Sequence, residues 1–192
     1  MDPYVYPGTS VLRNLRGIRD AESLSQFEAD ATSRRLLQLA RTPISLSFDI
    51  RHLQAIHHHI FQDVYQWAGE FRTVNIEKAE SVFAFKEHIA SYMTKTFGEL
   101  EGELHLAGTD LNRFAQRGAY YLGEINAVHP FREGNGRAQR EFIRELAVRN
   151  GYTLNWSAVS EEQMIEASRR SLLRDNTELE NLLTITLRTE PV

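Results

Sequence analysis

Proline placement constrains the fold of this chain more than any other sequence feature. The five prolines are Pro3, Pro7, Pro43, Pro130 and Pro191. Because proline disrupts the interior of a helix, helices can run through the long proline-free stretches on either side of Pro130. Apolar residues recur in these stretches at helical spacing, so the sequence predicts a mainly α-helical chain.

Length, charge and composition exclude several classes of protein. A chain of 192 residues is long enough for a domain with a sizeable core, and we expect a single domain over residues 1–192. The formal net charge of −4 argues against a strongly basic nucleic-acid binder, so we expect no direct contact with nucleic acid. The absence of cysteine excludes a disulfide scaffold, a thiolate metal site and a cysteine nucleophile.

Membrane and export signals are not found in the sequence. No apolar run approaches the length of a transmembrane helix. The first residues lack the basic and then apolar pattern of a signal peptide. We therefore expect a cytoplasmic protein without a membrane partner.

Capping residues and apolar spacing divide the chain into elements. Ser47 or Asp49 can cap a helix, which we expect to run to Gly69 as its C-terminal stop. Alternation of apolar and polar residues predicts a β-hairpin over residues 72–85. The other expected elements are an irregular arm over 1–19 and helices over about 20–41, 86–101, 111–127, 136–151, 160–174 and 177–188, with residues 111–150 forming a helix–loop–helix.

The stretch from His129 to Arg140, HPFREGNGRAQR, carries most of the chemical information. Pro130 forces a loop after the preceding helix. Gly134 and Gly136 let backbone N–H groups close around a ligand without Cβ clashes. A helix starts directly afterwards, so its free N–H groups and its positive dipole end face the same space. Such a turn binds anions, phosphate above all.

Charged and titratable side chains surround this turn. Arg137 and Arg140 lie three residues apart on the first turns of the helix and share a face, which suits a polyphosphate. Glu133 is the only carboxylate of the loop and can hold Mg²⁺ together with phosphate oxygens. His129 can take a proton from an attacking hydroxyl. The residues therefore predict a phosphoryl- or nucleotidyl-transfer site.

These residues resemble a known family. The stretch at 129–140 matches the full motif HxFx(D/E)GNGRxxR of Fic domains, and residues 57–69, HHHIFQDVYQWAG, resemble the helix upstream of it. Residues 71–85 stand where the family has its hairpin flap, and the arm DPYVYPGTSVLRN resembles the start of bacterial class I Fic toxins. The resemblance covers roughly residues 1–175 and implies the Fic fold, a helical bundle around a central helix–loop–helix with a small β-hairpin flap.

The resemblance implies a protein adenylyltransferase that moves AMP from ATP to a protein hydroxyl, with Mg²⁺ as cofactor and pyrophosphate as product. The site residues that it implies are His129 as general base, Phe131 as apolar anchor of the loop, Glu133 as Mg²⁺ ligand, Gly134, Asn135 and Gly136 as the anion hole, Arg137 at the β-phosphate region and Arg140 at the γ-phosphate.

By the same resemblance, the hairpin is the docking place for the target. It would pair with an extended target segment by β-augmentation and so place the target hydroxyl against the α-phosphate. Lys78, Ser81 and Phe83 either touch nucleotide or target or only shape the turn, and both interpretations stay open. The adenine is expected against residues 164–173, where no spacing singles out one residue.

Two features of the sequence indicate which group is transferred and how the activity is inhibited. Some Fic-like proteins carry lysine at the position of Gly136 and transfer phosphate, so Gly136 favours AMP transfer. The family's inhibitory motif (S/T)xxxE(G/N), whose glutamate pairs with the second motif arginine, does not occur in the sequence. We therefore expect a separate small antitoxin that supplies this helix. An unrestrained effector is the alternative, although 192 residues leave no room for a translocation domain.

The class I resemblance also suggests targets, namely the ATPase subunits of bacterial gyrase and topoisomerase IV. Transfer of another nucleoside-phosphate moiety is an alternative activity. A non-catalytic nucleotide-binding module is a further alternative, and the intact His129 and Glu133 speak against it.

The run from His57 to His59 invites interpretation as a metal site. Consecutive helical residues point about 100° apart, so three in a row cannot converge on one ion. We expect solvated or core-edge histidines instead. Tyr65 and Trp67 are expected to pack against apolar neighbours.

Overall fold

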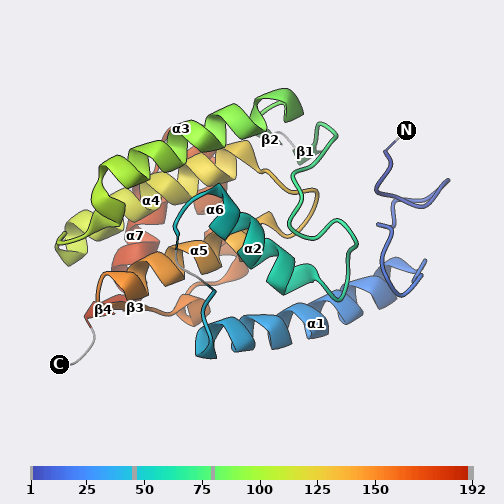
Figure 1. Ribbon diagram of the computed structural model, residues 1–192, viewed down its shortest axis with the longest axis horizontal. Helices are drawn as coiled ribbons and strands as arrows, with labels where there is room; N and C mark the ends of the chain where they lie inside the picture. The colour runs from blue at the N-terminus through green and yellow to red at the C-terminus, as the bar shows by residue number, and fades with distance from the viewer. Residues whose placement is uncertain (1, 45–46, 79–80, 190–192) are drawn as a thin grey trace.

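Helices form most of the described chain, which comprises residues 2–44, 47–78 and 81–189 of a computed structural model. This confirms the expected mainly α-helical fold with a small hairpin (Figure 1). No helix within the described ranges is long and apolar enough to cross a membrane. The elements are α1 (Ala21–Arg41), α2 (Ile50–Phe61), β1 (Glu77–Lys78), β2 (Ser81–Val82), α3 (Ile89–Gly102), α4 (Leu111–Val128), α5 (Asn135–Arg149), β3 (Tyr152–Leu154), α6 (Glu161–Leu172), α7 (Thr177–Thr186) and β4 (Leu187–Thr189), with short 3-10 turns at Lys86–His88, Leu104–Leu106 and Trp156–Ala158.

Side chains at the N-termini explain where the helices begin. Asp20, Asp49 and Asp110 each accept a hydrogen bond from the backbone N–H three residues later. Ser160 forms a capping box at the start of α6. Of the two caps considered for α2, the structure uses Asp49, whose carboxylate also accepts a hydrogen bond from Ser47. Each such cap stabilises its helix by about 1 kcal/mol.

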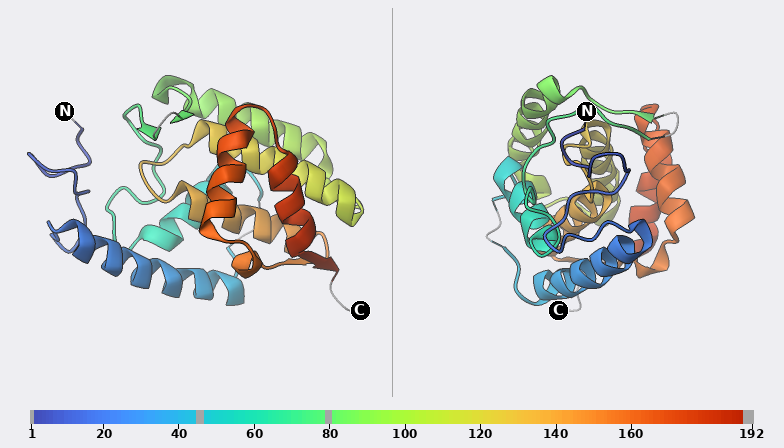
Figure 2. Two further views of the ribbon diagram at one scale, coloured as in Figure 1. Left: turned by 180° about the vertical axis from the view of Figure 1, so that it is seen from behind. Right: turned by 90° about the vertical axis from the view of Figure 1, so that its right-hand side faces the viewer.

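The helix–loop–helix formed by α4 and α5 lies at the centre of the molecule. Seen end-on, α1, α2, α3, α6 and α7 surround it (Figure 2, right). α2 packs on α5, while α6 and α7 pack on α4, so the loop between the two central helices is held from both sides. Side chains that fill this centre, each at most 1% exposed, are Leu122, Ile125, Phe142, Ile143 and Leu146.

The second helix is shorter than predicted, because it ends at Phe61 and not at Gly69. The N–H of Val64 turns back to the Phe61 carbonyl, and the Val64 carbonyl accepts the N–H of Leu15 from the arm at 2.8 Å. Gly69, with φ of +86°, closes a later turn by donating its N–H to Nδ1 of His57 at 2.8 Å. Hydrogen bonds to distant parts of the chain therefore replace two further helical turns.

The hairpin pairs over fewer residues than predicted. Among the described residues of 72–85, only β1 and β2 are paired, with Glu77 opposite Val82 and Lys78 opposite Ser81. The flanking chain does not extend this ladder, because its backbone bonds elsewhere: Ala84, for example, donates its N–H to the Ala127 carbonyl of α4.

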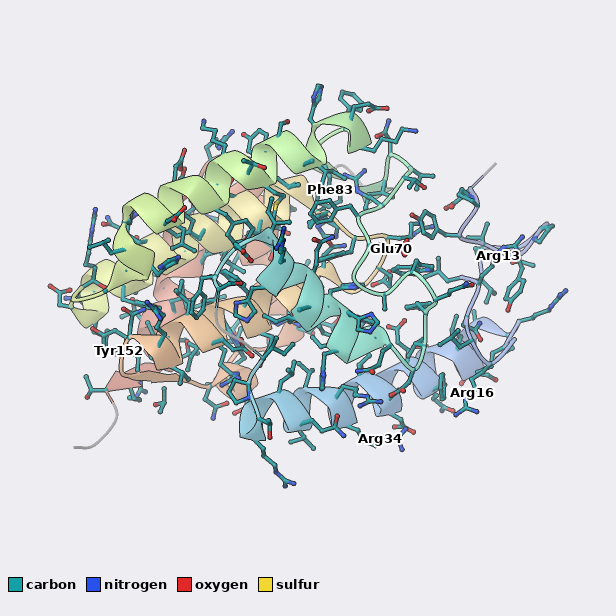
Figure 3. All side chains as sticks on the ribbon, viewed as in Figure 1. Arg13, Arg16, Arg34, Glu70, Phe83 and Tyr152 are labelled. Atoms are coloured by element: carbon teal, nitrogen blue, oxygen red, sulfur yellow. The ribbon has the colours of Figure 1, made fainter. Side chains whose placement is uncertain are left out.

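A second small sheet was not predicted. β3 pairs with β4, with Tyr152 opposite Thr189, so the last helix ends at Thr186 and does not reach residue 188. Strands of three residues are too short to show a periodicity of two. Tyr152 and Leu154 nevertheless face the core. Tyr152 lies at the end of the molecule away from Phe83, which follows the hairpin (Figure 3).

The N-terminal arm is irregular, as predicted, with one bridge between Val5 and Leu12. It reaches back to the loop between α4 and α5. The Asp2 carboxylate lies 2.8 Å from the guanidinium of Arg132 in the α4–α5 loop. The arm therefore contacts the loop that carries the sequence motif.

Candidate active site

His129 lies at the C-terminal end of α4, in a left-handed backbone conformation with φ of 49° and ψ of 61°. Its ring stacks on that of Phe83, with centroids 3.9 Å apart, where the chain leaving the hairpin returns toward α4 (Figure 3). Nδ1 lies 3.3 Å from the carbonyl oxygen of Asn126. A proton on Nδ1 satisfies this carbonyl and leaves Nε2 as the basic nitrogen. The geometry suits a general base.

The side chain of Asn135 closes the loop that follows His129. Its Oδ1 accepts the N–H of Phe131 and its Nδ2 donates to the carbonyl of the same residue, both at 2.8 Å. Phe131 is 1% exposed and stacks on the ring of His57 at 3.8 Å, in the core as expected of an anchor. Because both Oδ1 and Nδ2 of Asn135 bond the backbone of Phe131, it is the backbone N–H of Asn135 that can serve an anion hole.

Gly134 approaches another part of the core closely. Its φ is +79°, and a Cβ atom at this position would lie 2.0 Å from Cζ of Phe61. Glycine is therefore needed both for the backbone conformation and for the contact. The N–H of Gly134 donates to the Glu133 carboxylate at 2.9 Å, and the free N–H groups at the start of α5 follow directly.

The two motif arginines have different surroundings. Arg137 donates to the Glu28 carboxylate at 2.5 Å and to the Thr32 hydroxyl at 3.2 Å, and it lies over the ring of Phe61. Arg140 has no hydrogen-bond or ion-pair partner for its guanidinium in the described part of the chain. Burial and the nearby charge of Arg137 lower the pKa of Arg140. Arg140 is thus a partly buried cation available to an anionic ligand.

A cavity of about 740 Å³ is lined by Phe83, His129, Arg140 and the loop residues 133–137. Its opposite wall comes from α6, within the segment expected to hold adenine, and combines the apolar Met164, Ile165 and Leu172 with the polar Ser168 and Arg169. The indole N–H of Trp156 donates to the Arg140 carbonyl at 3.2 Å and ties this wall to α5. Cavity residues that the sequence did not single out are Asn126, Gln139, Trp156, Val159, Ser160 and Glu161, and the α6 side chains on the wall include Met164, Ile165, Ser168 and Leu172.

His57 is buried and supports the loop, so its assignment as a solvated or core-edge histidine is wrong. It is fully buried. Its Nε2 donates to the Glu133 carbonyl at 2.9 Å, and its Nδ1 accepts the N–H of Gly69. Burial lowers the pKa of His57 to about 3, so the ring is neutral near pH 7. Its helical spacing from the buried Leu53 and Ile60 was the available signal for burial.

Glu133 is the residue that could hold a metal ion together with a nucleotide. Among residues 2–44, 47–78 and 81–189, no group of three or more His, Asp or Glu side chains could hold an ion by itself. The Glu133 side chain is 30% exposed. Its Oε1 accepts from Gly134, and its Oε2 has no bond to another described residue. One accessible carboxylate beside a phosphate site fits Mg²⁺, which takes one or two carboxylates plus phosphate oxygens.

The hairpin residues singled out from the sequence are only partly described. Phe83 is 8% exposed and contacts His129, which places it at the site. Lys78 and Ser81 pair through their backbones, but their side chains lie outside the described residues.

Comparison with known proteins agrees with this geometry. Residues 47–147 match the Fic/DOC family. "Probable protein adenylyltransferase y4lH" of Sinorhizobium fredii is 40% identical over 91% of this chain and 90% of its own length. "Probable protein adenylyltransferase Fic" of Escherichia coli is 35% identical over 93% of this chain and 88% of its own length. "Protein adenylyltransferase VbhT" of Bartonella schoenbuchensis is 47% identical over 88% of this chain, which spans only 36% of VbhT.

Solved structures share the fold over nearly the whole chain. The N-terminal Fic domain of a VirB-translocated Bep effector protein from Bartonella quintana, with bound ADP, has a TM-score of 0.93 at 25% identity over 97% of this chain and 94% of its own. BepC from Bartonella tribocorum has the same TM-score at 24% identity, covering 98% and 97%. The chain therefore belongs to the Fic/DOC family and is an enzyme of the protein adenylyltransferase class.

Proposed function

We propose that this chain transfers AMP from ATP to a hydroxyl group of a target protein and releases pyrophosphate. The observation that carries the proposal is the cavity in which His129, the N-terminus of α5 and the guanidinium of Arg140, which has no partner among the described residues, face the wall formed by α6. The names of the relatives and the ADP bound in the Bartonella quintana structure support the same chemistry. We further propose that residues 1–192 act as one domain.

The nucleotide would lie along the cavity with its two ends in different surroundings. Backbone N–H groups at the start of α5, Arg137 and Arg140 would hold the phosphates. The α6 wall would take the adenine, because Met164, Ile165 and Leu172 offer the base apolar contacts there. Glu133 would hold Mg²⁺, which neutralises phosphate charge when bound.

His129 would act on the target hydroxyl. As the hydroxyl oxygen bonds to the α-phosphorus, its proton moves to Nε2 of His129, and the bond from the α-phosphorus to the bridging oxygen breaks. The electron pair of that bond leaves with pyrophosphate. Positioning and charge stabilisation supply most of the rate in such transfers, and the general base contributes about 10²–10⁴-fold. A target segment paired with the hairpin would bring its hydroxyl to this place.

Mass spectrometry of candidate targets incubated with ATP and Mg²⁺ tests the activity. An AMP-sized adduct is expected with the wild type and not with His129→Ala. His88→Ala, which removes an exposed histidine outside the cavity, is the matched control and should be active. A different nucleoside-phosphate adduct would favour the alternative transfer. Retained ATP binding without any adduct would mean a non-catalytic module.

We also propose a role as a cytoplasmic toxin held inactive by a small antitoxin. The support is the resemblance of the arm to class I toxins, the lack of an inhibitory motif in the sequence and the guanidinium of Arg140, which no described residue pairs and a glutamate could engage. A synthetic helix containing (S/T)xxxE(G/N) should inhibit transfer, and its Glu→Gln version should not. Equal effects of both peptides would refute inhibition through that glutamate.

The proposed targets are the ATPase subunits of gyrase and topoisomerase IV, on the class I resemblance alone. Incubation of these purified subunits with the enzyme should give an adduct on a hydroxyl side chain. An adduct that forms only on other proteins would refute this choice of target while leaving AMP transfer intact.

A further inference from the structure

The stem of the hairpin, by which we mean residues 72–76 before β1 and 83–84 after β2, supplies hydrogen-bond donors to the end of α4. A helix leaves its last carbonyls without partners inside the helix, and here two residues of the stem satisfy four consecutive carbonyls. The bonds are Ala84 N–H to the Ala127 carbonyl (3.1 Å), Arg72 Nη2 to the Val128 carbonyl (3.1 Å), Arg72 Nε to the His129 carbonyl (2.8 Å) and Arg72 N–H to the Pro130 carbonyl (2.8 Å).

The guanidinium of Arg72 also holds both sides of the stem. Its Nη1 donates to the Val74 carbonyl at 2.7 Å, and its Nη2 donates to the Ala84 carbonyl at 2.5 Å. The residue is 2% exposed, and within the described ranges it makes no salt bridge. A buried cation bonded only to carbonyls uses the planar, five-donor geometry that is particular to arginine.

The backbone of His129 needs such support. A left-handed conformation is unfavourable for a residue with a side chain, and it persists where surrounding contacts over-determine it. Arg72 bonds the carbonyls of His129 and of both its neighbours. Phe83, at the other side of the same stem, stacks on the His129 ring. The stem thus holds both the backbone and the ring of this residue.

We infer that Arg72 is a positioning residue, which fixes His129 for proton transfer and joins the catalytic loop to the hairpin. The inference rests on the proposed role of His129 as general base. A target segment that pairs with the hairpin acts on the same stem that orients His129. The phosphate-binding groups of α5 do not bond to Arg72, so its loss should impair the chemical step and spare nucleotide binding.

Kinetics of Arg72→Gln and Arg72→Lys test this inference. Arg117→Gln is the matched control, because Arg117 also joins two elements, through Glu103, but lies near the start of α4. Arg72→Gln should lower kcat by about 10²-fold, the scale of a misplaced catalytic group, with the affinity for ADP unchanged. Arg72→Lys should recover part of the loss, and Arg117→Gln should keep the wild-type kcat. An unchanged kcat in folded Arg72→Gln would overturn the inference.

Nuclear magnetic resonance gives a readout that does not depend on activity. Stacking on Phe83 should shift the ring protons of His129, assigned by their loss in His129→Gln. Arg72→Lys should move these signals and Arg117→Gln should not. If the Arg72 variants do not fold, hydrogen exchange in the wild type still tests the inference. The Nε–H of Arg72 should exchange with solvent as slowly as the amides of α4. Fast exchange would overturn the inference. An inactive wild type with slow exchange would instead refute the proposed function alone.

Discussion

Gly134→Ala tests whether the close approach of the motif loop to α2 controls stability. A Cβ atom at this position would lie 2.0 Å from Cζ and 2.2 Å from Cε2 of Phe61. Phe61 is fully buried, so its ring cannot move away without repacking the core. The left-handed backbone costs alanine about 1–2 kcal/mol, and overpacking costs about 1–3 kcal/mol. We expect the free energy of unfolding to fall by about 2–5 kcal/mol.

Gly151→Ala is the control for the backbone part of this loss. Gly151 has φ of +77°, close to the +79° of Gly134, but a Cβ atom there meets no atom within 4 Å. Urea denaturation of the two variants should therefore differ by the overpacking cost alone. Phe61→Leu should recover part of the stability in the Gly134→Ala background and none in the Gly151→Ala background. Equal losses in the two single variants would refute the reasoning.

Three further perturbations have expected results. Because burial holds the pKa of His57 at about 3, below the ordinary histidine value of 6.5, the unfolded chain gains a proton first as the pH falls. The free energy of unfolding should then drop by about 2 kcal/mol between pH 6.5 and pH 5, and His57→Gln should flatten this dependence in urea titrations. Glu28→Gln removes a negative charge beside Arg137 while its amide oxygen can still accept, so calorimetry should show ATP binding tightened by about fivefold. Weaker binding would show that the Glu28 charge is needed to orient Arg137. Asp110→Ala removes the N-cap of α4 and should lower stability by about 1 kcal/mol with kcat unchanged.

Local signals in the sequence were sufficient to predict most of the helices. The expected start of α4 agrees with the structure because the Asp110 carboxylate and the helix that it caps are adjacent in the chain. The expected end of α2 was wrong because Gly69 bonds to the buried ring of His57. The β3–β4 sheet joins residues far apart in the sequence, so no local pattern predicts it.

The candidate site likewise has a part that the sequence predicts and a part that it does not. Residues 129–140 are contiguous, and their glycines, charges and helix start were enough to predict an anion-binding turn followed by a helix. The parts that hold this turn come from other elements: His57 on α2 bonds the Glu133 carbonyl, and Arg72 bonds the His129 carbonyl. Neither residue differs in type or spacing from an ordinary surface or core residue.

The sequence by itself determined the helical class of the chain, and it was enough to predict a turn for phosphate and the residues proposed for the chemistry. These depend on proline, glycine and charge within a few neighbouring residues, where backbone sterics and helix dipoles act. Only the tertiary structure decided that Arg137 is paired with Glu28 while Arg140 has no partner among the described residues. It also decided that the hairpin stem holds His129. Side-chain pairing and burial depend on which distant segments meet, and that is a property of the packed chain.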